Sequence, residues 1–434
     1  MTERLVTEHA ADVAVIGGGP AGIAAACAAA GAGKQVVLLD ASPRPGGQVW
    51  RHRDRGALPR GASDWLGRLE ASGATVLAGA NVVDIDAGFR IGAEQQGRAV
   101  AVTAGAVVLA TGAQELFLPF PGWTLPGVIG VGGAQALLKA GMEVRGKRVV
   151  IAGTGPLLLP VAAALARAGA DLRMVAEQAP PREVRRFAAS LWRTPARLVQ
   201  AALYRSAFAT VRYRWGTWIE RIVEDDGALL VTWTTGRSRW LEPADLVCTA
   251  AGLVPSTELA RLAGCEVAEG VVVVDEQQRT SVPGIHAAGE PTGNTGMEAA
   301  LVEGAIAGLV AAGQRGSGAV GQLQAAGAKH RQFAERAAIA FRLRPELRER
   351  AEPDTIVCRC EDVPLSAIHA DWGAREAKLA TRAGMGPCQG RICGPALHHL
   401  FGGGPDTARV PAVPTSLGVL RALTDRPEDT RGVS

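Results

Sequence analysis

The chain contains 434 residues, of which 47% are hydrophobic, and it carries a formal net charge of +4. This length predicts about three domains and provides enough apolar material for more than one core. The small net charge gives no reason to expect a nucleic-acid-binding protein. Arginines do cluster between Arg182 and Arg214, but no nucleic-acid-binding motif accompanies them. The cluster is either a solvated helix face or a surface for a partner protein or an anionic cofactor.

No targeting signal is visible at the N-terminus, because the first apolar run, Val13 to Ile16, already belongs to a nucleotide-binding motif. The longest apolar stretches are rich in alanine and too short to span a bilayer. The seven cysteines are few, and four of them gather near the C-terminus, which fits a reducing compartment better than a disulfide framework. We therefore expect a cytoplasmic protein without a transmembrane segment.

Residues 12–40 are predicted to form a strand, a glycine turn, a helix and a second strand. In the turn, Gly17 allows a tight bend, Gly19 lets the backbone approach a pyrophosphate, and Gly22 lets the helix pack closely on the strand. Asp40, at the end of the second strand, is placed to accept a hydrogen bond from an adenosine ribose hydroxyl. Because both strands and the acid accompany the glycine turn, the segment is predicted to bind a dinucleotide.

Three later segments indicate which dinucleotide binds. They are a Gly-Gly-Gln sequence, a strand ending in Ala-Thr-Gly and a strand ending in Gly-Glu, and their residues of interest are Gly47, Gln48, Thr111, Gly112, Gly289 and Glu290. This set in this order resembles the flavoproteins with two dinucleotide domains, such as thioredoxin reductase and glutathione reductase. The resemblance implies that the Ala-Thr-Gly turn closes an FAD domain. It also implies that the Gly-Glu pair, where aspartate is the usual acid, meets the pyrophosphate and ribityl chain of FAD, and Val82 is expected beside the adenine.

A second nucleotide motif lies between the FAD segments. A predicted strand leads into a turn with Gly153 and Gly155, and the next strand, residues 171–177, ends in Glu177. Glu177 would bind a ribose diol and repel a 2′-phosphate, which favours NAD over NADP. The third glycine position holds Leu158, so the helix cannot approach the strand as closely as in a standard unit. Three outcomes stay open: NAD, another adenine nucleotide, or an empty vestigial site.

No Cys-x-x-Cys pair occurs in the chain, although the disulfide reductases of the flavoprotein family place one beside the flavin. Cys27, Cys248 and Cys265 are expected to be small buried hydrophobic residues. Electrons that leave the flavin therefore need a different acceptor.

The other four cysteines lie close together near the C-terminus, as the pairs Cys358 with Cys360 and Cys388 with Cys393. Thiolates gathered in this way bind a soft metal centre, and an iron–sulfur cluster takes four of them. The alternatives are a structural zinc site and unligated thiols. Zinc sites more often use cysteines separated by two to four residues, so the tight first pair favours iron. We predict a ferredoxin-like electron-transfer module.

This cysteine unit resembles the [2Fe–2S] domain of the bacterioferritin-associated-ferredoxin type, with a longer second spacing. With the sequences at 252–259, 262–265 and 381–391, it resembles the FAD-binding α subunits of heteromeric amino-acid and opine dehydrogenases. That group includes opine oxidase, hydrogen cyanide synthase, D-hydroxyproline dehydrogenase and multimeric proline dehydrogenases, and the resemblance covers nearly the whole chain. In such complexes a separate β subunit, which is a flavoprotein similar to D-amino-acid oxidase, removes hydride from the carbon beside an amine. Some complexes add a small ferredoxin-like subunit.

The resemblance implies an α/β fold with two Rossmann-like domains, the NAD-type domain being inserted in the FAD domain, and a small, mainly helical [2Fe–2S] domain. The expected boundaries are 1–118 and 248–312 for the FAD domain, 119–247 for the NAD-type domain, 313–352 for a linker and helix, 353–400 for the [2Fe–2S] domain and 401–434 for an extended arm.

The function that the resemblance implies is electron transfer, through FAD and a [2Fe–2S] cluster, from the β subunit to an acceptor. No residue of the chain is nominated as the base that activates an amine, because hydride abstraction belongs to the partner. Two alternatives stay open. One is a stand-alone NADH-dependent reductase that passes electrons through its own cluster, and the other is a scaffold subunit whose nucleotide sites serve only folding.

Overall fold

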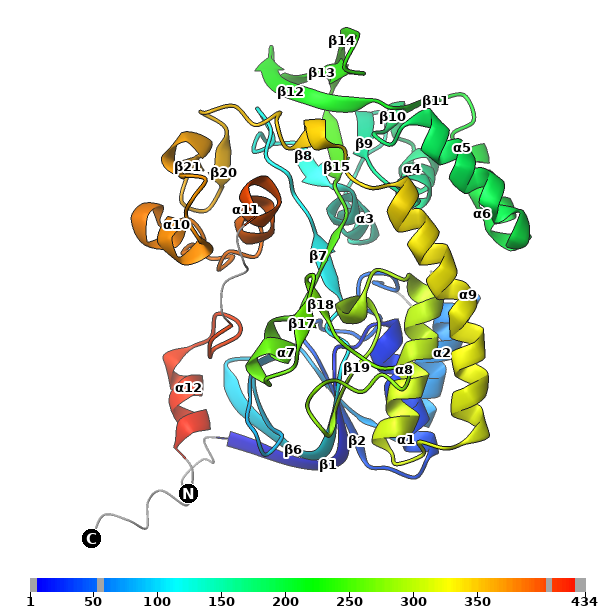
Figure 1. Cartoon of the computed structure of the whole chain (residues 1–434), viewed down its shortest axis with the longest axis vertical. Helices are drawn as coiled ribbons and strands as arrows, with labels where there is room; N and C mark the ends of the chain where they lie inside the picture. The colour runs from blue at the N-terminus through cyan, green and yellow to red at the C-terminus, as the bar shows by residue number, and fades with distance from the viewer. Residues whose placement is uncertain (1–5, 53–57, 403–407, 426–434) are drawn as a thin grey trace. The chain divides into compact units, whose positions relative to one another are not determined.

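The computed structural model describes residues 6–52, 58–402 and 408–425. The chain forms two compact units (Figure 1). Unit 1 consists of Met1–Gln114, Pro255–Ala334 and Thr407–Ser434, and unit 2 consists of Glu115–Val254 and Glu335–Asp406. The FAD-type motifs thus fall in unit 1, whereas the second nucleotide motif and the four C-terminal cysteines fall in unit 2. The chain passes between the units through β7 (Ala113–Glu115), β16 (Leu253–Pro255) and α9 (Gly318–Ala340).

A parallel sheet forms the centre of unit 1, with an antiparallel extension on one side. Its order is β3-β2-β1-β6-β5-β4, and β19 also pairs with β6. The strands are β1 (Val6–Ile16), β2 (Val36–Asp40), β3 (Thr75–Ala78), β4 (Ala80–Ile85), β5 (Arg90–Gln95), β6 (Arg98–Leu109) and β19 (Ile285–Ala287). The central strands read as continuous apolar runs because both faces of the sheet are covered.

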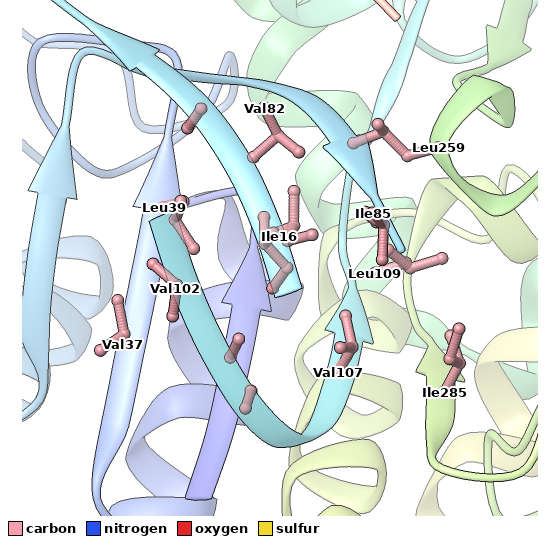
Figure 2. Packing of buried hydrophobic residues seen from close by; sticks show 14 of the residues in the cluster. Ile16, Val37, Leu39, Val82, Ile85, Val102, Val107, Leu109, Leu259 and Ile285 are labelled. Atoms are coloured by element: carbon pink, nitrogen blue, oxygen red, sulfur yellow. The ribbon is translucent and has the colours of Figure 1, made fainter. Parts of the chain in front are cut away.

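Two clusters of buried side chains cover the two faces of this sheet. One includes residues of β4, β5 and α7 (Glu258–Leu262) together with the parallel strands. Figure 2 shows part of it, with labelled side chains that include Ile16, Leu39, Val82, Ile85, Val107 and Leu109. The other cluster joins the sheet to α1 (Pro20–Gly31), α2 (Arg60–Ala71) and α8 (Met297–Ala311). The short strands β17 (Val267–Ala268) and β18 (Val271–Val272) complete the unit with a 3₁₀ turn at Glu290–Thr292.

Helices α1 and α8 lie side by side (Figure 1) and approach each other very closely. A Cβ added at Gly304 would lie 2.0 Å from the carbonyl oxygen of Ala21, and one added at Gly308 would lie 2.2 Å from that of Ala25. Both helices are apolar all round because each is enclosed between the sheet and other helices. The glycines of α8 and the alanines of α1 therefore allow two backbones to meet at the glycine turn.

The prediction of an extended arm over 401–434 is wrong for part of that range. Helix α12 (Leu417–Thr424) begins at Ser416, whose side chain accepts a hydrogen bond from the N–H of Val419. Its buried face, Val419, Ala422 and Leu423, packs on side chains of β4 and β6. This spacing of three and four residues places the apolar side chains on one helical face, and burial against the sheet favours the helix over an extended chain.

Unit 2 contains a second parallel sheet, in the order β11-β10-β9-β15-β8, beside an antiparallel sheet, β12-β13-β14. The strands are β8 (Val128–Gly130), β9 (Arg148–Gly153), β10 (Asp171–Glu177), β11 (Arg212–Trp215), β12 (Trp218–Asp225), β13 (Ala228–Thr234), β14 (Arg239–Ala244) and β15 (Leu246–Ala250). The helices are α3 (Val131–Lys139), α4 (Leu158–Arg167), α5 (Pro181–Ser190) and α6 (Pro195–Ser206), with a 3₁₀ turn at Leu191–Arg193.

The C-terminal part of unit 2 is mainly helical. It contains 3₁₀ turns at Pro345–Leu347 and Leu365–Ala367, the short strands β20 (Ile356–Cys358) and β21 (Val363–Pro364), and the helices α10 (Ala374–Thr381) and α11 (Cys393–Phe401). A small core that includes Cys358 and Cys393 holds these elements together. The predicted α/β class, with parallel sheets and a helical C-terminal region, is confirmed. Among the described helices, none combines the length and the apolar character that a bilayer crossing needs.

Candidate functional site

The first glycine turn connects β1 to α1 in unit 1. Gly17 has a φ of +106°, and a Cβ added there would lie 2.1 Å from the carbonyl oxygen of Ala110. A Cβ added at Gly22 would lie 1.8 Å from the carbonyl oxygen of Gly17. At Gly19 the nearest atom to an added Cβ is the Cα of Gly47, 4.0 Å away. The chain's own packing thus requires glycine at the first and third positions, whereas Gly19 leaves room beside the N-terminus of α1, where a pyrophosphate is attracted.

Asp40, at the end of β2, has one oxygen without a hydrogen-bond partner of good geometry among the described residues. Its Oδ1 accepts a hydrogen bond from the N–H of Ser42 at 3.1 Å. Its Oδ2 is buried against Gly18 and has no hydrogen-bond partner within the described residues. Burial raises the pKa of this carboxyl group, although the main-chain N–H groups of Ser42 and Gly18 lie near enough to offset part of that rise. An unpaired buried oxygen is costly, and a ribose hydroxyl that donates to it would remove the cost. The residue fits the adenosine half of FAD.

The other residues predicted to bind FAD in this part of the chain are Gly47, Gln48 and Val82, and they differ in what they can offer. Gly47 has a φ of +57°, and a Cβ added there would lie 2.9 Å from the Cα of Gly19. Gln48, the next residue, is exposed. The side chain of Val82 is buried in the core beneath the sheet, so only its main chain can meet an adenine. The structure therefore brings Gly47 to the glycine turn and places the Val82 side chain in the core.

The two later FAD segments meet each other in unit 1. The Thr111 hydroxyl donates to the carbonyl oxygen of Ser256 at 2.6 Å. Gly112 and Gly289 adopt φ angles of +73° and +76°, so both turns need glycine. A Cβ added at Gly112 would lie 3.9 Å from a carboxylate oxygen of Glu290, whose pKa burial raises. Segments separated by more than a hundred residues thus form one site.

Glu303 is a site residue that the sequence interpretation missed. It lies on α8 with only 3% of its surface exposed. Its Oε2 accepts from the N–H of Gly289 at 3.0 Å, and its Oε1 accepts from the Thr295 hydroxyl. The signal available in the sequence was a carboxylate in an otherwise alanine- and glycine-rich apolar helix. The residue holds the turn that presents Glu290.

Substituting Glu303 is expected to change how stability depends on pH. Burial raises the pKa of Glu303 to about 7, above its ordinary value of 4.5. The folded state therefore favours the protonated form of Glu303. The resulting contribution to the free energy of unfolding is complete below pH 4.5 and is lost as the pH rises through about 7. Glu303→Gln, which cannot ionise, should raise the free energy of unfolding at pH 8 by roughly 2–3 kcal/mol and leave it unchanged near pH 4.5. Denaturant unfolding across this range measures the effect.

The control for this prediction is Glu335→Gln, which replaces an exposed glutamate of α9. It should leave the pH profile of the unfolding free energy unchanged. If the free energy of unfolding of Glu303→Gln changed with pH in parallel with that of the wild type, Glu303 would not have the raised pKa that burial in this turn implies.

The second glycine turn, in unit 2, uses its acid differently. A Cβ added at Gly153 would lie 2.2 Å from the carbonyl oxygen of Ala250, so the first glycine position is again required by packing. Glu177 is fully buried, and its two oxygens accept from the N–H groups of Gly155 at 2.7 Å and Ala179 at 2.8 Å. Burial raises its pKa to about 7. Leu158, also fully buried, fills the space between α4 and the sheet.

The arginine-rich segment forms α5, the following 3₁₀ turn and α6. Between residues 181 and 214 the only acidic side chain is Glu183. The exposed large apolar residues of the segment are Trp192, Leu198, Val199 and Leu203. Val199 and Leu203 are four residues apart and Leu198 adjoins them, so α6 presents an apolar stripe outward. This favours a surface for a partner over a simple solvated helix face.

The four C-terminal cysteines form two pairs of thiols in contact. Cys358 lies against Cys393, and Cys360 lies against Cys388. Cys358 and Cys393 are buried, Cys388 is half-buried and Cys360 is exposed. Within the described residues no three or more metal-ligating side chains surround a single point closely enough to hold an ion. The thiol donors fit an iron–sulfur cluster in kind and number. Charge interactions also link Cys360 to Cys358 and Cys393 to Cys388, so the four thiols lie in one group.

Main-chain groups prepare this site for negative charge. Burial raises the pKa of the Cys388 thiol, but the main-chain N–H of Ile392, the side chain of Cys360 and the N–H groups of Gly390 and Arg391 together outweigh burial and lower that pKa overall. A Cβ added at Gly386 would lie 2.2 Å from the Cβ of Cys360, so the loop needs glycine there. The second loop is therefore shaped to hold a thiolate sulfur.

The cysteine loops are attached to the rest of unit 2. The indole N–H of Trp123 donates to the carbonyl oxygen of Ile356 at 2.6 Å, just before Cys358. Ile392, just before Cys393, packs against the core beneath β9 and β15, which contains Trp123. The segments that carry Cys358 and Cys393 are thus fixed to the same core.

Comparison with known proteins agrees with these sites. Residues 11–316 match the model of the family described as pyridine nucleotide-disulphide oxidoreductase. The chain is 35% identical over 424 residues to an opine oxidase subunit of Agrobacterium tumefaciens (strain Ach5), covering 88% of this chain and 84% of that protein. It is 33% identical over 428 residues to hydrogen cyanide synthase subunit HcnB of Pseudomonas aeruginosa, covering 87% of this chain and 90% of that protein.

A solved structure supports the same fold. The L-proline dehydrogenase from P. horikoshii superposes with a TM-score of 0.66 at 20% identity, over 96% of this chain and 80% of that one. The family match, over residues 11–316, includes the segment that contains the first glycine turn and Asp40. The chain therefore belongs to the pyridine nucleotide-disulphide oxidoreductases, among the homologues of this opine oxidase subunit and of HcnB, and it is an FAD-dependent oxidoreductase.

Proposed function

We propose that this chain is the electron-transfer subunit of a heteromeric amino-acid or opine dehydrogenase of the cytoplasm. FAD would be bound by residues 1–118 and 248–312, and a [2Fe–2S] cluster by residues 353–400, with 119–247 as the NAD-type domain. The observation that carries the proposal is the contact between thiols in both cysteine pairs, in a chain with no Cys-x-x-Cys to accept electrons from a flavin. Its relatives are also named as subunits of larger enzymes.

The chain's own residues would bind and orient both groups. Bound FAD accepts electrons in pairs and a bound [2Fe–2S] cluster carries them singly, so together they convert two-electron into one-electron transfer. Gly19 and the N-terminus of α1 would hold the pyrophosphate, and Asp40 would accept a hydrogen bond from a ribose hydroxyl. The N–H groups around Cys388 would stabilise thiolate charge. No residue here is assigned to activate an amine.

The substrate would be oxidised on a partner. That partner is a flavoprotein β subunit similar to D-amino-acid oxidase, with a small ferredoxin-like protein as a third subunit in some assemblies. The apolar stripe of α6, flanked by arginines, is the candidate surface for a partner with an acidic rim. The runner-up function, a stand-alone NADH-dependent reductase, would need a nucleotide in unit 2.

A reconstitution experiment tests the proposal. The purified chain is expected to reduce a dye with an amino acid or opine as donor only after the β subunit is added. The mixture should also co-elute on size exclusion. A chain that oxidises amines alone, at the rate of the mixture, would contradict this division of labour. Rapid bleaching of its flavin by NADH alone would instead favour the runner-up.

A further inference from the structure

The segment between α9 and β20, residues 341–350, runs across the second glycine turn of unit 2, and we name it the strap. We propose that the strap fills the crevice in which a dinucleotide domain holds its nucleotide, and that it thereby excludes NAD and NADH from this chain. The inference concerns unit 2 alone and does not depend on the electron relay proposed above.

Polar groups that would face a nucleotide are bonded to the strap instead. The Thr154 hydroxyl, in the glycine turn, donates to the carbonyl oxygen of Phe341 at 2.9 Å. Gln178 directly follows Glu177, the residue at the position of a ribose-binding acid. Its Nε2 donates to the carbonyl oxygen of Arg342 at 3.1 Å. Its Oε1 accepts from the N–H of Arg344 at 3.1 Å. Three successive hydrogen bonds therefore fasten the strap to the residues on either side of the crevice.

Apolar and aromatic contacts hold the strap along its length. The ring of Phe341 meets that of Phe187 edge-on, with centroids 5.0 Å apart. The guanidinium of Arg344 lies 4.5 Å from the centre of the Trp218 ring. Leu347 is 4% exposed and packs with Leu118 and Trp218. These contacts bury large side chains, so displacement of the strap would be costly.

Arg350 closes the end of the strap. Its guanidinium is buried although part of the residue reaches the surface, and it donates to the carbonyl oxygens of Ile219 at 3.1 Å and Leu118 at 3.3 Å. It also stacks on Phe120, 4.4 Å from the ring centre. Burial lowers its pKa to about 9. The buried guanidinium has no carboxylate partner among its described hydrogen bonds, and a buried unpaired charge is costly. Arg350 therefore holds the strap through its two carbonyl hydrogen bonds and its stack on Phe120.

Little room is left between the strap and the turn. The cavity there has a volume of about 30 Å³ and is lined by residues that include Gly153, Gln178, Trp218 and Arg350. That is the space of about one water molecule, whereas small-molecule sites measure several hundred Å³. Glu177, which occupies the position of the ribose-binding acid, is closed as well, because it is fully buried and each of its oxygens already accepts from a main-chain N–H group. Asp40, its counterpart in unit 1, keeps one oxygen unbonded.

The test measures NADH binding to the full-length, FAD-loaded protein by calorimetry and by energy transfer from tryptophan. The wild type is expected to show no saturable binding. The double variant Gln178→Ala/Arg350→Ala removes the fastenings at both ends of the strap. It should show saturable NADH binding, with a Kd at least about tenfold below the highest NADH concentration at which the wild type shows none. Arg348→Ala, at an exposed position of the same segment, is the matched control and should behave as the wild type.

Two results would overturn the inference. One is saturable NADH binding by the wild type. The other is a double variant that retains its FAD and its thermal melting profile yet still binds no NADH, since the strap would then not be what excludes the nucleotide. If the double variant does not fold, amide hydrogen exchange of the wild type decides. The Arg344 N–H should exchange slowly and excess NADH should leave its rate unchanged, whereas an NADH-dependent rate would refute the closed crevice.

Discussion

Replacing Cys393 with alanine is expected to abolish the binding of iron and acid-labile sulfide and to leave the FAD content unchanged. Cys393 is buried at the start of α11 and contacts Cys358, so its loss breaks one of the two thiol pairs. A [2Fe–2S] centre takes four cysteine ligands, and alanine supplies no donor at the vacated position. Iron and sulfide analysis per FAD, on anaerobically purified protein, measures the effect together with the visible spectrum.

The control is Cys27→Ala, which removes a half-buried thiol from α1 in the other unit. It should retain a full complement of iron and sulfide. A Cys393→Ala protein that still holds the wild-type amount of both would show that this thiol is no ligand. A wild type that binds zinc alone would refute the cluster itself.

Gly22→Ala is expected to yield a protein that lacks FAD and unfolds more easily. The added Cβ would lie 1.8 Å from the carbonyl oxygen of Gly17 and 3.4 Å from the side chain of Ala110, so α1 must move away from the turn. That movement displaces the helix N-terminus that attracts the pyrophosphate. We expect the free energy of unfolding to fall by about 3 kcal/mol or more, as for other substitutions that overpack a core. FAD absorbance per chain and denaturant unfolding measure both effects.

Gly31→Ala is the matched control, because Gly31 ends the same helix and an added Cβ there meets nothing within 4 Å. It should retain FAD and be as stable as the wild type or more stable by up to about 1 kcal/mol. A Gly22→Ala protein that binds FAD and unfolds like Gly31→Ala would show that the turn is less crowded than the structure indicates.

The elements around the FAD turn could be predicted because their causes are local. A few adjacent residues specify the strand that ends at Ile16, the turn with Gly17 and the helix that ends at Gly31. Their backbone geometry and apolar side chains allow few other local structures. Helix α12 could not be predicted in this way. Its short apolar face stabilises a helix only when it packs against Val83 and Ala101, and these residues lie more than three hundred positions earlier in the chain.

The two ribose acids show where sequence reasoning ends. Asp40 and Glu177 occupy the same place in their motifs. The sequence predicts a dinucleotide at the first motif and leaves NAD, another adenine nucleotide or an empty site open at the second. In the structure one oxygen of Asp40 has no hydrogen-bond partner among the described residues, whereas Glu177 is fully buried and each of its oxygens accepts from a main-chain N–H group. The role of Glu303 likewise depends on tertiary structure, because its carboxylate accepts from the N–H of Gly289 only where α8 lies beside that turn.

The amino-acid sequence by itself determined the α/β class, the order of the nucleotide motifs and the four thiols suited to iron. These depend on spacings within short segments, where backbone geometry and side-chain chemistry act directly. Only the tertiary structure decided that the thiols meet in pairs, that Glu303 holds the Gly289 turn and that residues 341–350 lie over the second turn. Those outcomes depend on hydrogen bonds and packing between segments far apart in the chain, and no local pattern specifies which distant segment will satisfy a buried polar group.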